Sequence, residues 1–426
     1  MIRIGPDGIP PVAISPERGF SFMLAMPAHE TRPEPNRPAV PRERFRYTAA
    51  TFHRCSPYHS RIVSTDSVIA PRSVTVRTRP VPPGVPRLSA LVIDPAAPVV
   101  SLLDRFGPGS QSAAVTPDQA LAYVKGLATS HYENFSVLSS LVPLDLRDDF
   151  AAVYAFCRWS DDLGDETGRD QAARDRSLEL LAWWRTELDR CYAGAPSHPV
   201  YIALAKTIER RKLPRKPFDD LISAFEQDQR LCEYSTWDQL VDYCTRSANP
   251  VGRLVLMLAG YFPEHQKPTD PDRFAMSDAI CTALQLTNFW QDVRRDLIER
   301  DRIYLPETET GLSPATLRDW LNRGDEPAVR VAYIRALRPL VDRTEELFIQ
   351  GDPLPSTLNP AIRPVVGLFS AGGRSVLQGV RRAGCTTLWH RPKLGKLTKL
   401  SLVARAFIAA KLAGTASTRT TTEAAA

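Results

Sequence analysis

Four acidic side chains fall within six residues directly after an apolar, aromatic stretch of the chain. Asp161 and Asp165 are four residues apart there, so they lie on one side of a helix. Like charges at this spacing repel each other, which indicates that the pair serves to hold a cation. Paired carboxylates favour a hard ion such as Mg²⁺, which completes its shell with water and phosphate oxygens. A solvated helix end is the alternative interpretation of this stretch taken alone.

A second acidic pair lies in the longest helical pattern, at about 271–299. Gln285, Asn288, Asp292 and Asp296 follow at spacings of three, four and four, and so form one polar stripe on an otherwise apolar helix. Such a stripe is costly to bury unless its groups have partners. Two helices of this kind, facing each other, can hold divalent cations that clamp a diphosphate. We therefore predict four metal ligands for Mg²⁺, with Mn²⁺ as the alternative ion: Asp161, Asp165, Asp292 and Asp296.

Helical patterns surround both acidic pairs. Order should begin near Thr116, where Pro117 suits the first helical position. No sustained alternation of period two indicates a sheet, so we predict an all-α fold, a single large helical bundle at 113–390. Apolar residues recur every three or four positions in the remaining segments: 143–163, 171–192, 199–210, 217–231, 326–351, 360–384 and 393–412.

The sequence of the first 112 residues does not predict a folded domain. They hold about half of the 37 prolines and show no sustained periodicity. Residues 1–110 carry 14 Arg, no Lys and 8 acidic residues, which accounts for the whole net charge of +6. We expect a disordered extension, with a mis-assigned start codon as another explanation. The nearly neutral remainder gives no support for nucleic-acid binding.

Cysteine usage and hydropathy bear on the location of the protein. The seven cysteines form no C-x-x-C motif, which favours reduced thiols and a cytoplasmic location. No apolar run approaches the ~18 residues of a membrane span. Residues 391–426 alternate basic and apolar positions, which is typical of a basic interfacial helix or of a final bundle helix with a solvated face. Peripheral contact with the cytoplasmic membrane face therefore stays open.

The acidic motifs resemble those of the squalene/phytoene synthase family. Asp161-x-x-x-Asp165 and Asp292-x-x-x-Asp296 are similar to its two aspartate-rich motifs, and the resemblance covers about residues 116–390. The family has the isoprenoid synthase fold, a helical bundle with a central cavity. Further segments occur in the family's order: Tyr154-x-x-Cys157-Arg158, Gln285-x-x-Asn288 and Arg302-Ile-Tyr304-Leu-Pro306.

Three segments resemble the hopanoid-associated hydroxysqualene synthase branch more closely: His131-Tyr-Glu-Asn-Phe135, Tyr243-Cys-Thr-Arg-Ser-Ala-Asn-Pro-Val-Gly-Arg253 and Asn288-Phe-Trp-Gln-Asp292. That branch converts presqualene diphosphate and water to hydroxysqualene and diphosphate. Two segments depart from the wider family, at 132–135 and at 247–252, where a first diphosphate and an allylic chain would bind. We therefore expect ionisation of presqualene diphosphate. Condensation of two farnesyl diphosphates, or phytoene synthesis, is the alternative.

The resemblance also implies roles for individual side chains. Aromatic faces would stabilise a carbocation, although Phe289, Trp290 and the tyrosines could equally be core packing. The residue that positions the water stays open among His131, Asn134, Tyr234 and Tyr304. The implied catalytic residues are Tyr154, Tyr243, Tyr304 and His131, and the implied substrate-binding residues are Tyr132, Asn134, Phe135, Arg158, Tyr234, Gln285, Asn288 and Arg302.

Other partners follow from the same resemblance. We expect a prenyl diphosphate substrate and leave contacts with other enzymes of the squalene pathway open. No G-x-G-x-x-G follows a strand, and we expect no nicotinamide cofactor. A non-catalytic assembly partner with the same fold is a further alternative, but it would have no reason to keep buried, mutually repelling carboxylates.

Overall fold

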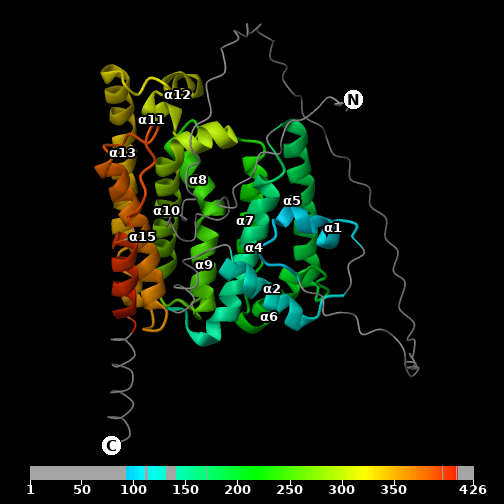
Figure 1. Cartoon of the computed structure of the whole chain (residues 1–426). Coiled ribbons are helices and arrows are strands. Elements are labelled where there is room, and N and C mark those ends of the chain that lie inside the picture. Colours follow the sequence, from blue (N-terminus) through cyan, green and yellow to red (C-terminus); the bar gives the residue numbers. More distant parts are fainter. Residues whose placement is uncertain are drawn as a thin grey trace, which may run out of the picture. The chain divides into compact units, whose positions relative to one another are not determined.

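The computed structural model describes residues 93–110, 114–130, 141–168, 170–395, 397–408 and 410. Over these residues the chain is helical, and its only β-type pairing is an isolated parallel bridge between Glu233 and Ile303. The all-α prediction is confirmed (Figure 1). The extension predicted for the first 112 residues lies outside the described residues up to position 92.

The structured part begins before the boundary expected near residue 112. A 3₁₀ turn at Val99–Leu102 and the short helix α1 (Leu103–Phe106) follow Ile93. Ile93 and Phe106 are buried and belong to the same apolar core as the later helices. The sequence pattern missed this stretch because single buried side chains in short turns leave no periodic signal.

Ten helices of ten or more residues build the described body up to Arg382. Proline at a first helical turn and polar N-caps begin many of them, as at Thr236, whose side chain forms a capping box with Gln239. The ten are α2 (Pro117–Ser130), α4 (Arg147–Asp165), α5 (Gln171–Tyr192), α6 (Pro199–Arg211), α7 (Lys216–Asp228), α8 (Trp237–Ser247), α9 (Asn249–Leu258), α10 (Arg273–Arg295), α13 (Pro327–Gly351) and α15 (Arg363–Arg382).

Short helical segments connect the long ones. They are η2 (Leu144–Leu146), η3 (Pro263–His265), the π-helical turn η4 (Asp296–Arg300), α11 (Glu307–Thr310), α12 (Pro314–Trp320) and α14 (Leu354–Thr357).

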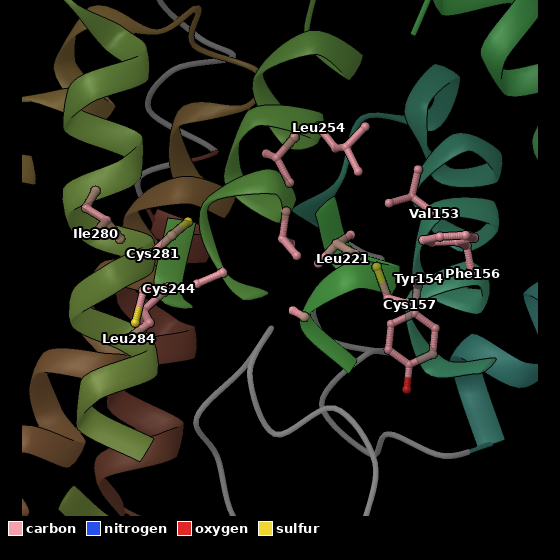
Figure 2. Packing of buried hydrophobic residues seen from close by; sticks show 14 of the residues in the cluster. Val153, Tyr154, Phe156, Cys157, Leu221, Cys244, Leu254, Ile280, Cys281 and Leu284 are labelled. Carbon is pink, nitrogen blue, oxygen red and sulfur yellow. The ribbon is translucent and has the colours of Figure 1, made fainter. Parts of the chain in front are cut away.

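The helices α4 and α10, which carry the two acidic pairs, each form the centre of one set of neighbours. Helix α4 packs against α2, α5, α6 and α7, whereas α10 packs against α8, α9, α13 and α15. Figure 1 shows α7, α8 and α9 between α4 and α10. Figure 2 shows core side chains from both sides, with Val153 and Phe156 of α4 facing Leu254 of α9 and Ile280 of α10 beyond it. The acidic pairs lie at the C-terminal ends of α4 and α10.

The chain continues past α15 into a C-terminal segment. Cys385 adopts a left-handed backbone conformation with φ 56°, which turns the chain back after the helix. Residues 397–408 are helical, in agreement with the pattern predicted at 393–412. Among the described residues, no helix is both long and apolar enough to cross a membrane.

Candidate active site

Asp165, at the last position of α4, is held by two arginines. Arg302 donates a hydrogen bond from Nη1 to Oδ1 of Asp165 at 2.9 Å, and Arg300 forms an ion pair with Oδ2 at 3.0 Å. Burial alone would raise the pKa of Asp165, but the charges of Arg300 and Arg302 outweigh it and lower that pKa. Asp165 is therefore an ionised carboxylate at neutral pH.

The second acidic motif does not continue as a regular α-helix. Helix α10 ends at Arg295, and Asp296 begins the π-helical turn that closes at Asp301, where φ is 52°. The helix predicted to about residue 299 does continue to Arg300, but its last turn is π-helical. A π-turn is wider than an α-turn, and such turns often lie at functional sites.

Arg300 joins the two motifs. It lies 3.9 Å from Oδ1 of Asp296 as well as contacting Asp165, so one guanidinium spans an acid from each pair. Burial raises the pKa of Asp296 to about 7; Arg300 opposes this shift and the charge of Asp292 adds to it. The two motifs thus meet at one place, as the facing-helix prediction requires.

Asp292 is engaged by the C-terminal segment. Arg391 contacts both of its carboxylate oxygens, with Nη2 3.1 Å from Oδ2, and Arg295 lies 3.3 Å from Oδ2. Gln291 also donates a 2.7 Å hydrogen bond to the carbonyl oxygen of Pro392. A segment nearly one hundred residues away therefore covers the second acidic motif.

A wall of aromatic rings stands beside the arginines. Phe289 and Tyr304 stack at 3.8 Å between centroids with 5° between planes, and Tyr234 lies 5.7 Å from Tyr304. Tyr243 donates a 2.8 Å hydrogen bond to Oδ2 of Asp228. The bridge at Ile303 holds this strand-like segment, since the Ile303 amide donates to the Cys232 carbonyl at 2.7 Å. Aromatic rings can stabilise a cation, and Tyr243 links this group of rings to Asp228.

Other predicted site residues lie away from these aromatic rings or outside the described part of the chain. Arg158 is buried and pairs with two other acids of the first motif: its Nε lies 2.7 Å from Oδ2 of Asp162, and its Nη2 lies 3.7 Å from Oε1 of Glu166. Trp290 donates to Thr344 on α13 and so packs in the core. Tyr154 is buried on α4 beside Cys157 (Figure 2). Four predicted residues lie outside the described part of the chain: His131, Tyr132, Asn134 and Phe135.

Three residues of the site were not predicted. Arg300 follows Asp296 by four positions, a spacing that pairs charges on a helix and could have revealed it. Asp228 is a single acid at the end of α7, and Arg391 lies far from its partner in the chain, so neither leaves a local signal. The site therefore contains more charge than the two acidic pairs alone.

The residues fit a divalent ion that is shared with a substrate. Within the described ranges, no group of three or more His, Cys, Asp and Glu side chains is placed to hold a metal ion. Mg²⁺ commonly binds one or two carboxylates and takes its other oxygens from phosphate and water. The donors here are all oxygens, and Oδ1 of Asn288, on the same stripe as Asp292, is buried without a hydrogen-bond partner. The oxygen donors of Asp161, Asp165, Asp292, Asp296 and Asn288 suit Mg²⁺.

An apolar cavity lies between α9, α10, α14 and α15. It has a volume of about 50 Å³ and is lined almost wholly by carbon, with Gly252 at its wall. A Cβ added at Gly252 would overlap Sγ of Cys281 and Oγ of Ser277. The missing side chain thus lets α9 approach α10 closely at the wall of this narrow apolar slot.

Known proteins are similar to this chain over most of its described helices. A family model described as squalene/phytoene synthase matches residues 128–398. A phytoene synthase of Arthrospira platensis is 30% identical over 60% of this chain and 82% of its own. A hydroxysqualene synthase of Rhodopseudomonas palustris is 31% identical over 53% of this chain and 71% of its own.

Solved structures are similar to this chain as well. The squalene synthase HpnC from Alicyclobacillus acidocaldarius is 38% identical, with a TM-score of 0.53 over 63% of this chain and 95% of its own. A dehydrosqualene synthase solved with a ligand has a TM-score of 0.55 at 23% identity, over 69% of this chain and 98% of its own. The second likeness shows the fold alone.

Proposed function

Since the chain belongs to the squalene/phytoene synthase family, we propose that it is a hydroxysqualene synthase. The proposed substrate is presqualene diphosphate. The bond between its carbinyl carbon and the diphosphate oxygen breaks, the cyclopropylcarbinyl cation rearranges, and a water oxygen bonds to carbon. The water gives up one proton, so the products are hydroxysqualene, diphosphate and a proton.

The observation that carries this proposal is the bridge that Arg300 makes between the two acidic motifs. A leaving diphosphate gains negative charge, and positive groups already held in place stabilise that charge without reorganisation. Arg300 and Arg302 are such groups, and guanidinium suits multidentate contact with phosphate. When bound by the five oxygen donors named above, Mg²⁺ would neutralise further diphosphate charge.

The aromatic wall supports the second half of the reaction. The faces of Phe289 and Tyr304 can stabilise a carbocation without forming a bond to it. In this proposal the tyrosine hydroxyls of the wall would orient a water molecule. Asp228, which accepts a hydrogen bond from Tyr243, would take the proton that this water loses. The apolar slot beside Gly252 would take part of the prenyl chain.

The choice within the family rests on resemblance. Hydroxysqualene synthases are 31% and 35% identical to this chain, the second from Zymomonas mobilis over 41% of this chain and 54% of its own. Phytoene synthases are about equally similar. The departures from the wider family at 132–135 and 247–252 favour ionisation over condensation. A transferase that condenses two farnesyl diphosphates is the second candidate.

Product analysis tests the proposal. Purified protein with Mg²⁺ is supplied separately with presqualene diphosphate and with farnesyl diphosphate, without and then with NADPH. We expect a C30 alcohol from presqualene diphosphate alone, whether or not NADPH is present, and its loss in Asp161→Ala. Turnover of farnesyl diphosphate as the sole substrate would establish the transferase instead.

We also propose that the protein works at a membrane surface, from the cytoplasm. A C30 alcohol is nearly insoluble in water, so its release requires an apolar phase. Transfer of the product to another enzyme of the squalene pathway would meet the same need.

A further inference from the structure

The C-terminal helix at 397–408 has an uncovered apolar stripe. Leu397 is 83% exposed, Leu400 66% and Ile408 59%. Phe407 is exposed as well. Successive residues of this set are separated by three, seven and one positions along the chain, so all four side chains lie on one face of the helix: Leu397, Leu400, Phe407 and Ile408. Leu394, just before the helix, is buried and does not belong to the stripe.

The opposite face of the same helix packs onto the body of the protein. Leu402 and Ala406 are buried and belong to the main apolar core. Figure 1 draws this helix in red at the end of the described chain. The buried face therefore already attaches the helix to the body, and the apolar stripe takes no part in that packing.

The surrounding sequence has a single sign of charge. No Asp or Glu occurs between Asp352 and Glu423, whereas six basic residues fall between 391 and 411. Arg405 is exposed on the helix itself, at the edge of the stripe. An apolar stripe with basic flanks matches an anionic lipid surface, which attracts Lys and Arg and accepts apolar side chains between its headgroups. A second copy of the chain would bring the same positive charge and be repelled.

We propose that the stripe formed by Leu397, Leu400, Phe407 and Ile408 docks the protein onto an anionic lipid bilayer. The segment just before the helix is fixed to α10 by Arg391 on Asp292 and by Gln291 on the Pro392 carbonyl. Docking therefore places a bilayer beside the end of α10. The choice of a bilayer rests in part on the proposed function, whose product is insoluble in water. Because vesicle binding requires no turnover, the docking proposal and the proposed function can each fail without the other.

Vesicle co-sedimentation of the full-length protein tests the proposal. Vesicles of phosphatidylcholine, with and without phosphatidylglycerol, are titrated at low and high salt. We expect binding only with phosphatidylglycerol, weakened by salt. The double variant Leu397→Asn/Leu400→Asn should bind the vesicles at least about tenfold more weakly than the wild type, because two apolar side chains no longer enter the interface. Arg405→Gln should cost about fivefold, the effect of one basic residue near the surface.

Matched controls use the same substitutions elsewhere. Val331→Asn/Ile349→Asn changes two exposed apolar side chains on α13, and Arg330→Gln removes an exposed charge from the same helix. Both should bind vesicles like the wild type. Equal binding by the stripe variant and the wild type would overturn the proposal. The proposal would also be overturned if the wild-type protein did not bind anionic vesicles but instead associated with itself or with an acidic protein, and if the stripe variant lost that association.

Discussion

Arg302 donates a 2.9 Å hydrogen bond to Asp165, although 137 residues separate the two in the chain. Together with the ion pair from Arg300, this bond ties the end of α4 to the π-helical turn after α10. A predicted metal ligand thus also holds two distant elements together. Mutations at the two acids of the first motif should therefore have different consequences.

Asp165→Asn should lower the free energy of unfolding by about 2–4 kcal/mol, because the buried Arg302 and the partly exposed Arg300 lose their nearest counter-charge and keep only the longer contacts to Asp228 and Asp296. Asp161→Asn removes a half-buried carboxylate and should cost less than about 1 kcal/mol. Both variants should lose activity. Urea unfolding of each variant, with no metal added, measures the difference.

Equal stability losses in the two variants would show that the arginine pairing at Asp165 contributes little. Asp342→Asn serves as the control for a surface ion pair, since Asp342 pairs with the partly exposed Arg381 at 2.7 Å. Its loss should change stability by less than about 1 kcal/mol.

Arg391→Gln should strengthen the binding of a divalent ion to the substrate-free protein. Arg391 occupies both oxygens of Asp292, so a metal ion has to displace it. Removing this competing contact should tighten Mn²⁺ affinity by about three- to tenfold. Titration followed by electron paramagnetic resonance measures it, with Arg381→Gln as the matched control. Weaker or unchanged Mn²⁺ binding in Arg391→Gln would contradict the prediction.

Gly252→Ala should push α9 and α10 apart at the wall of the apolar slot. The added Cβ overlaps Cys281 and Ser277, so helix packing must give way, at a cost of about 1–3 kcal/mol. The KM for the prenyl substrate should rise because the wall of the slot that would take part of its chain is displaced. Gly372→Ala on α15 is the control, since a Cβ there meets no atom of another element within 4 Å. A Gly252→Ala protein with wild-type stability and KM would remove the slot from the substrate path.

Local patterns predicted the parts of the site that lie within single helices. The spacing of Asp161 and Asp165 placed both acids at the end of α4, and the apolar period found α10 with its polar stripe. Periodicity failed at Asp296, because a π-helical turn inserts a residue into a helix without any marker that the pattern could reveal.

Long-range pairings were beyond the reach of the sequence. Arg391 and Asp292 are 99 residues apart, and nothing in either segment specifies the other. Asp228 reads as one acid among many on a surface helix, until Tyr243 and Arg302 are found around it. Such contacts depend on how the helices pack, which a single sequence does not show.

Asp228→Asn should change the pH dependence of stability and of turnover. Burial raises the pKa of Asp228 to about 6, opposed by Arg302 and assisted by the charge of Asp165. An unfolded Asp has a pKa near 3.9, so the folded protein takes up a proton between about pH 6 and 4. The carboxylate therefore destabilises the fold at pH 7, and this effect disappears as the pH falls through that window.

The Asn variant still accepts the hydrogen bond from Tyr243 but carries no charge. Relative to the wild type, it should be more stable at pH 7 by at most about 2–3 kcal/mol and should lose this advantage near pH 4. Because deprotonated Asp228 is the proposed proton acceptor for the captured water, kcat of the wild type should fall below about pH 6, whereas the variant should be slow at every pH. Urea unfolding and kcat are measured from pH 4 to 8. Parallel pH profiles in the two proteins would contradict both the raised pKa and the proposed role.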